Sequence, residues 1–242
     1  MYEPRTYRHW VKDKSLISFN VTVKETDLYI RASRNLKSKA LKLVLEYRDI
    51  LERYIERHPL FLTALEPLPA NDNAPRIVNT MLESARKAGV GPMASVAGAI
   101  AEFVGTELLA FSPEVIVENG GDIYLKSLGE MIVGIYAGKS PLTGKIGLEI
   151  NGEDTPLGIC TSSGTVGHSL SYGEADAVVV LSQSATLADA AATAIGNLIK
   201  QQADIPGGIE FAKSIEGLRG MLIVKDDKIG LWGEVKICQT SQ

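Results

Sequence analysis

The chain opens with an alternation of apolar and polar side chains over residues 16–31, which includes Phe19, Val21 and Val23. A period of two is typical of half-buried strands, so this segment is predicted to form a β-hairpin. Over residues 36–58 the apolar positions recur instead at helical spacing, with charged residues on the other faces. This pattern predicts an amphipathic helix that Pro59 ends.

Residues 66–75 concentrate proline, asparagine and aspartate, which favour turns and block helices. We therefore place a boundary near residue 70. Residues 1–70 are expected to form an N-terminal hairpin and covering helix, and residues 71–242 the core, the two making one compact unit.

Two helices are predicted next, over residues 77–85, where Gly89 suits a left-handed C-terminal cap, and over residues 92–110, which begins with a proline. The second helix is rich in small side chains, which let a neighbouring backbone or a ligand approach closely. Tight packing and ligand binding both explain them. These small residues are Ala94, Ala97, Gly98, Ala101 and Gly105.

Short apolar segments separated by glycine-rich turns follow, at residues 115–117, 123–125, 131–136, 146–150 and 177–181. A long helix is expected over residues 187–202, a break at Gly207 and Gly208, and a final hairpin of residues 221–224 and 229–237. We expect a mixed α/β (α+β) fold in which two mostly antiparallel sheets pack on central helices. Strand-end loops would form a cleft between the lobes.

Composition narrows the function classes. The 242 residues are 45% hydrophobic and 22% charged, as in ordinary globular proteins, and carry a net charge of -4. This charge argues against a nucleic-acid partner. Two cysteines are too few for a disulfide scaffold or a thiolate metal site. The N-terminus is polar and no apolar run reaches the ~18 residues of a membrane span, so a cytoplasmic protein without a membrane partner is predicted.

Asp189 and Thr193 lie four residues apart in the long predicted helix, which places both oxygens on one face. Hard cations such as Mg²⁺ prefer oxygen ligands and keep positions for water and phosphate. The alternative is structural. Thr186 and Asp189 have the spacing of a capping pattern at the positive end of their own helix.

Asn119, Gly120, Gly121 and Asp122 form a second candidate segment at a predicted strand end. Paired glycines expose backbone N–H groups and permit left-handed conformations, so this loop could cradle an anion or the edge of a ring. It also suits a simple hairpin turn.

A third candidate is residues 161–169, which offer five hydroxyls, two glycines and one imidazole. Thr161, Ser162 and Ser163 could bind phosphate oxygens, and His168 could hydrogen-bond a ring or phosphate near neutral pH. The alternative is a polar surface loop capped by its own side chains. The neighbouring Cys160 is better explained as a buried small hydrophobe than as a nucleophile.

Taken together, these segments resemble the ApbE-like flavin transferase superfamily in order and spacing. The resemblance runs from about Gly91 to the C-terminal hairpin and rests on N-G-G-D at 119–122, T-S-S-G at 161–164 with His168, and A-D-A-A-A-T at 188–193. It implies that FAD is bound, that Mg²⁺ is the metal, and that FMN passes to a threonine of an acceptor protein.

The resemblance also implies residue roles. Asp189, Thr193 and the backbone carbonyl of Ala97 would hold Mg²⁺, and Asp189 and His168 would be catalytic. His168 and seven further residues would bind the flavin nucleotide. The seven are Asn119, Gly120, Gly121, Asp122, Thr161, Ser162 and Ser163.

The chain departs from the transferases at two places. Gly98 and Phe103 stand where the family has a lysine and an aspartate, and residues 168–173 lack the aspartate and proline that follow the family's histidine. V-G-P-M-A at 90–94 and C-T-S-S-G-T-V-G-H-S at 160–169 are similar instead to a short, cytosolic, uncharacterised branch of the superfamily.

Two functions follow as hypotheses. The first is a Mg²⁺-dependent enzyme that acts on a flavin nucleotide such as FAD, by FMN transfer or pyrophosphate hydrolysis. The alternative is a non-catalytic nucleotide-binding or accessory protein, which the resemblance associates with sulfur amino acid (homocysteine) metabolism. A small-molecule nucleotide, an acceptor or partner protein and a second copy in a homodimer are the expected partners.

Overall fold

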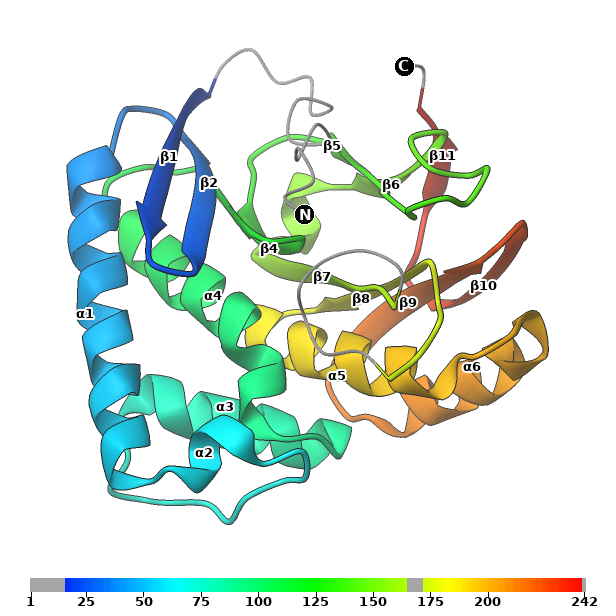
Figure 1. The fold of residues 1–242 in the computed structure, drawn as a ribbon. Coiled ribbons are helices and arrows are strands. Elements are labelled where there is room, and N and C mark those ends of the chain that lie inside the picture. Colours follow the sequence, from blue (N-terminus) through cyan, green and yellow to red (C-terminus); the bar gives the residue numbers. More distant parts are fainter. Residues whose placement is uncertain (1–15, 165–171, 241–242) are drawn as a thin grey trace.

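The computed structural model describes residues 16–164 and 172–240. One large antiparallel sheet lies between a layer of helices and a smaller sheet (Figure 1). The predicted mixed α/β class with antiparallel sheets is confirmed. His168 and the other residues of 165–171 lie outside the described ranges.

The large sheet has eight strands in the order β1-β2-β3-β4-β7-β8-β9-β10, and the small sheet has the order β11-β6-β5. The predicted N-terminal hairpin is confirmed, and its second strand pairs with β3 of the core in the same sheet. The division at residue 70 stays a prediction. The strands are β1 (Ile17–Val23), β2 (Thr26–Ala32), β3 (Val115–Asn119), β4 (Asp122–Lys126), β5 (Met131–Gly134), β6 (Ile146–Ile150), β7 (Leu157–Ser162), β8 (Ala177–Ser182), β9 (Leu218–Lys225), β10 (Lys228–Gly233) and β11 (Ile237–Gln239).

The central strands are buried on both faces. In β8 all six residues are buried, with Val178 and Val180 in the core beneath the helices and Val179 and Leu181 in the core beneath the small sheet. Successive strand residues point to opposite faces, so each face meets a separate apolar layer. Near-continuous apolar segments here therefore reflect two-sided burial.

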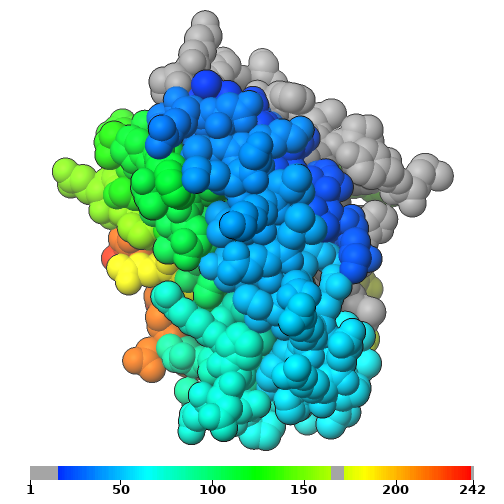
Figure 2. Space-filling view, turned by 90° about the vertical axis from the view of Figure 1, so that its left-hand side faces the viewer, coloured from blue at the N-terminus to red at the C-terminus, as the bar shows by residue number. Residues whose placement is uncertain are grey.

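The helices cover the other face in a defined order. α4 contacts β3 and β4, α5 contacts β7 and β8, and α6 contacts β9 and β10. α1 packs against β1 and α4. Figure 2 shows that the N-terminal segments, in blue and cyan, cover much of this side of the molecule. The helices are α1 (Lys37–Arg57), α2 (Leu60–Thr63), α3 (Arg76–Ala88), α4 (Val96–Leu108), α5 (Ala185–Leu198) and α6 (Ile205–Ser214), with short 3₁₀ turns at Pro92–Ser95, Gly152–Asp154 and Gln202–Asp204.

Several local predictions hold. α1 ends one residue before His58, and Gly89 caps α3 in the left-handed conformation with φ of 73°. The helix predicted over 92–110 begins as a 3₁₀ turn and becomes α-helical only at Val96.

Three local predictions were wrong. Gly207 and Gly208 do not break the chain but lie in the first turn of α6, where Pro206 is tolerated. Residues 229–237 are not one strand, because Gly233 adopts φ of 81° and the chain leaves β10 for the small sheet. Thr161 and Ser162 belong to strand β7 and not to a loop.

Within the described residues, no single helix has the length and hydropathy to cross a membrane. The pair formed by Arg76–Ala88 and Pro92–Leu108 meets those criteria only jointly and is bent by 103°.

Glycine 158 sets how closely α5 approaches the sheet. A Cβ at Gly158 would lie 2.3 Å from Ala185 Cα, a backbone atom that cannot move cheaply. We expect Gly158→Ala to lower the free energy of unfolding by about 1–3 kcal/mol, because the helix must shift from the sheet. Urea denaturation measures this. Gly129→Ala is the matched control, since no atom lies within 4 Å of its added Cβ, and equal losses in both variants would contradict the explanation.

Candidate functional site

The candidate site is built on the crossing of α4 and α5. A Cβ at Gly98 would lie 2.3 Å from the carbonyl oxygen of Ala185 and 2.8 Å from Asp189 Cβ. Only glycine permits this approach, so the small residues of α4 serve close packing here. A Cβ at Gly105 would likewise meet the Tyr124 ring of β4 at 2.3 Å.

Asp189 caps the N-terminus of the other helix. Its Oδ2 accepts a hydrogen bond from the Gly98 N–H at 2.8 Å, and the Ala97 N–H also donates to this carboxylate. Ala97 and Gly98 are the second and third residues of α4, whose own N-cap residue, Ser95, provides no side-chain cap. Asp189 thus satisfies first-turn donors that α4 cannot satisfy itself.

Glu102 of α4 makes the reciprocal contact with α5. Its Oε2 accepts from the Thr186 N–H at 2.9 Å, the Thr186 hydroxyl at 2.8 Å and the Ser184 hydroxyl at 2.8 Å. Ser184 is the N-cap of α5 and accepts from the Leu187 N–H. Each helix therefore supplies a carboxylate to the positive end of the other. The predicted capping of its own helix by Asp189 was wrong, since Ser184 and Glu102 do this.

The predicted loop at 119–122 is the two-residue turn of the β3–β4 hairpin. Asn119 and Asp122 are directly paired, and Gly120 and Gly121 have φ of 70° and 110°, which glycine adopts without strain. The Gly121 N–H donates to Glu118 Oε1 at 3.0 Å. Asn119 Nδ2 donates to the Ala97 carbonyl at 3.1 Å and so ties the hairpin to the first turn of α4.

Asp122 is buried beside this turn, with 7% of its surface exposed, and its Oδ1 has no hydrogen-bond partner. Burial raises the pKa of Asp122 well above its ordinary value, and the charge of Asp189 raises it further. Hydrogen bonds from the Cys160 thiol and the Thr161 N–H offset part of this. Burial also raises the pKa of Asp189 to about 7, against the hydrogen bonds from Gly98 and Ala97.

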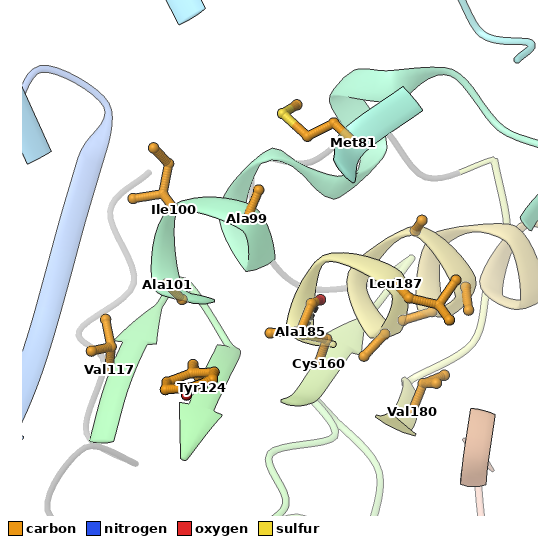
Figure 3. Packing of buried hydrophobic residues seen from close by; sticks show 14 of the residues in the cluster. Met81, Ala99, Ile100, Ala101, Val117, Tyr124, Cys160, Val180, Ala185 and Leu187 are labelled. Atoms are coloured by element: carbon orange, nitrogen blue, oxygen red, sulfur yellow. Dashed lines mark hydrogen bonds between the residues drawn. The ribbon is translucent and has the colours of Figure 1, made fainter. Parts of the chain in front are cut away.

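Cys160 lies under α5 and is fully buried. Its Sγ donates to the Ala185 carbonyl at 3.2 Å, and Figure 3 shows Cys160 directly beneath Ala185. Burial, then the charges of Asp122 and Asp189, raise the pKa of this thiol well above its ordinary value. A neutral, inaccessible thiol fits the predicted packing role and not that of a nucleophile.

Part of the third candidate segment, residues 161–169, lies next to the β3–β4 hairpin turn. A Cβ on Gly121 would lie 3.8 Å from the Thr161 carbonyl, so the end of β7 adjoins the hairpin turn. Ser162 lies farther along, 3.3 Å from the Cβ position of Gly196 on α5, and the Ser163 hydroxyl donates to the Ala175 carbonyl at 3.5 Å. His168 lies outside the described residues.

The donor set fits a small hard cation. The Asp189 carboxylate, the half-buried Thr193 hydroxyl four residues on and the Ala97 carbonyl are all oxygens, and the buried Asp122 Oδ1 lacks a partner. Within residues 16–164 and 172–240, no three His, Cys, Asp or Glu side chains are placed to hold a metal. A cation here would therefore depend on few carboxylates, with backbone, hydroxyl, water or phosphate oxygens completing the shell.

Two hollows lie elsewhere on the described part of the chain. One, of about 730 Å³, is lined by residues including Asp154, Pro156 and Arg219. The other, of about 380 Å³, lies between α1 and the segment that follows α2, with Tyr54, Phe61 and Leu68 in its wall. Neither contains a residue of the candidate site.

Sequence reasoning missed Glu102 and the contact of Gly98 with α5. A signal was present, because Gly98, Glu102 and Gly105 are spaced by four and three residues and so share one helix face. A glutamate between two glycines on a packing face indicates a buried partner for its charge.

Loss of the Glu102 carboxylate should weaken the helix pair. We expect Glu102→Gln to lower the free energy of unfolding by about 1–2 kcal/mol, because a charged acceptor leaves the N-terminus of α5. Glu107→Gln, at an exposed position of the same helix, should stay within about 0.5 kcal/mol. Chemical denaturation measures the free energy of unfolding of both variants. Equal losses would argue against the reciprocal cap.

The raised pKa of Asp189 predicts a pH dependence of stability in metal-free protein. Between its ordinary value of 3.8 and about 7, the folded protein keeps a proton that the unfolded chain has lost, so stability falls as pH rises through this window. Asp189→Asn cannot titrate. Urea unfolding with EDTA should therefore show wild type losing stability relative to Asp189→Asn between these pH values, whereas a constant difference would contradict the assignment.

A family model described as AbpE bacteria matches residues 8–207. Similar relatives include UPF0280 proteins of Methanocaldococcus jannaschii, 43% identical over 221 residues with 89% of this chain and 90% of the relative covered, and of Methanopyrus kandleri, 43% identical over 225 residues with 90% and 91% covered.

Solved structures share the fold. The ApbE protein of Thermotoga maritima aligns with a TM-score of 0.56 at 13% identity over 90% of this chain and 97% of its own, and the flavinyl transferase ApbE of Pseudomonas stutzeri with a TM-score of 0.54 at 13% identity over 90% and 94%. With a family model that matches most of its length and relatives above 40% identity, the chain belongs to the AbpE bacteria family.

Proposed function

We propose that this protein is a Mg²⁺-dependent enzyme that acts on a flavin nucleotide such as FAD, by transferring FMN to an acceptor protein or by hydrolysing the pyrophosphate. The observation that carries the proposal is the convergence of three chain segments. Asn119 bonds the first turn of α4, Asp189 caps that turn, and Gly121 adjoins Thr161. The shared fold with a flavinyl transferase supports the choice of substrate class.

In this proposal Asp189, Thr193 and the Ala97 carbonyl hold the cation. When bound, Mg²⁺ would neutralise charge on the pyrophosphate oxygens as the phosphoanhydride breaks. Asp189 has a second task, because its carboxylate fixes the first turn of α4 and so the position of the Ala97 carbonyl. Asn119 holds the same carbonyl from the sheet side at 3.1 Å.

The hairpin turn and the end of β7 would bind the nucleotide. Gly120 and Gly121 present backbone without side chains, and Thr161 and Ser162 at the end of β7, with Ser163 directly after the strand, add hydroxyl groups. His168 completes the proposed set as the group near the nucleotide. A cytoplasmic location and a homodimer remain part of the proposal.

One observation favours the alternative, a non-catalytic nucleotide-binding or accessory protein, with sulfur amino acid metabolism as its context. Asp189 is already engaged in capping α4, so its burial has a structural explanation that needs no metal. Under this alternative FAD binds without turnover.

Turnover of FAD distinguishes the enzyme from the non-catalytic binding protein. FAD incubated with the protein and Mg²⁺ should yield AMP together with FMN, either free or attached to protein, and EDTA should stop this. Asp189→Asn keeps an oxygen that can accept the Gly98 N–H but removes the charge, and we expect its rate to fall by about a hundredfold or more, since a metal contributes several kcal/mol. Chromatography of the nucleotides measures the products.

Asp154→Asn is the control, because Asp154 is a half-buried partner of Arg219 away from the site. Saturable FAD binding, followed by flavin fluorescence, without AMP formation would establish the accessory function instead. A protein that neither binds nor cleaves FAD would refute both.

A further inference from the structure

The site contains a second buried carboxylate that the proposed ligand set does not use. Asp122 is 7% exposed, and its Oδ1 is both inaccessible to solvent and without a hydrogen-bond partner. A buried carboxylate oxygen without a partner is costly, and proteins retain such groups where a ligand or ion completes them.

Asp122 faces the helices and not the small sheet. It is paired directly with Asn119, so the two side chains lie on the same face of the hairpin. The Asn119 side chain reaches the Ala97 carbonyl of α4, and Cys160, which also interacts with Asp122, donates to the Ala185 carbonyl of α5. Asp122 therefore lies between the sheet and the first turns of both helices.

Asp189 approaches the same place from the opposite side. Its carboxylate bonds the N–H of Gly98, the residue after Ala97, and the Ala97 carbonyl is held by Asn119, the strand partner of Asp122. The groups that stabilise ionised Asp122 are the neutral Cys160 thiol and Thr161 N–H. Two buried carboxylates beside the same first turn of α4 form a suitable place for a divalent cation, which attracts both.

We propose that Asp122 and Asp189 together ligate one divalent cation, with one carboxylate supplied by the start of β4 and the other by α5. The inference rests on the proposed function and adds Asp122 as a metal ligand, where the proposed set uses it only to line the nucleotide pocket. The Thr193 hydroxyl and the Ala97 carbonyl complete the protein donors. Both carboxylates are held by rigid elements, so the site selects a small, oxygen-preferring ion.

Mn²⁺ is a suitable probe, because the EPR signal of the free ion reports binding directly, with and without FAD. Wild type should bind one Mn²⁺, and Asp122→Asn and Asp189→Asn should each bind at least about tenfold more weakly, since even residues that only orient metal ligands contribute that much. Asp176→Asn is the matched control. Asp176 is a similarly buried aspartate whose carboxylate accepts from the Asp226 N–H at the turn after β9, and its variant should bind as wild type does.

Thermal unfolding adds a readout that a structural role would not produce. Without metal, Asp122→Asn should melt at or above the wild-type temperature, because a neutral amide replaces a buried carboxyl group whose Oδ1 has no hydrogen-bond partner. With saturating Mn²⁺ the order should reverse, because only wild type gains the full binding energy. A merely structural Asp122 predicts a lower melting temperature in both conditions. Asp122→Ser repeats the comparison if the amide variant does not fold.

The outcomes distinguish this inference from the function on which it rests. Wild-type Mn²⁺ affinity in Asp122→Asn, together with weakened binding in Asp189→Asn, overturns the role of Asp122 and leaves the proposed function standing. Wild type that binds no Mn²⁺, with or without FAD, overturns both.

Discussion

The structure depends on an exchange of carboxylates between two helices. Asp189 of α5 accepts two first-turn N–H groups of α4, and Glu102 of α4 accepts the Thr186 N–H and the Ser184 and Thr186 hydroxyls of α5. The exchange is feasible because Gly98 has no side chain to separate the helices. Buried helix ends must find acceptors, and here each finds one on its neighbour. The crossing is thereby fixed in both position and direction, and the sheet beneath it receives a defined surface.

This constraint explains why acidic groups gather where burial disfavours them. Asp189 is held by two backbone N–H donors at the positive end of α4, which compensates part of its cost, whereas Asp122 has one backbone donor, from Thr161, and the Cys160 thiol. The β3–β4 hairpin turn is joined to these helices by the hydrogen bond from the Asn119 side chain to the Ala97 carbonyl. The same carboxylate and carbonyl atoms therefore contribute both to the stability of the fold and to the proposed chemistry. An amide in place of a carboxylate separates the two contributions better than alanine does, because it keeps an acceptor oxygen.

Local patterns predicted the parts of the fold that local physics decides. Period-two alternation located the β1–β2 hairpin, helical spacing located α1, and Gly89 marked the end of α3. Partners distant along the chain were not predictable in this way. The acceptor for Gly98 lies 91 residues away, and Gly208 is required in its helix because a side chain there would meet Ile199 and Ile223. Strand β7 was also missed, because its last residues, Thr161 and Ser162, are polar, only partly buried and typical of loops.

The two cysteines give this protein a built-in reporter of its own opening. Cys238 is partly accessible, whereas Cys160 is sealed beneath Ala185. A thiol reagent can reach Cys160 Sγ only when α5 separates from β7. The rate at which Cys160 is alkylated after Cys238 therefore measures how often this local opening occurs. Because that same motion separates α5 from α4, the labelling rate of Cys160 would report how often the hydrogen bonds of Asp189 and Glu102 break.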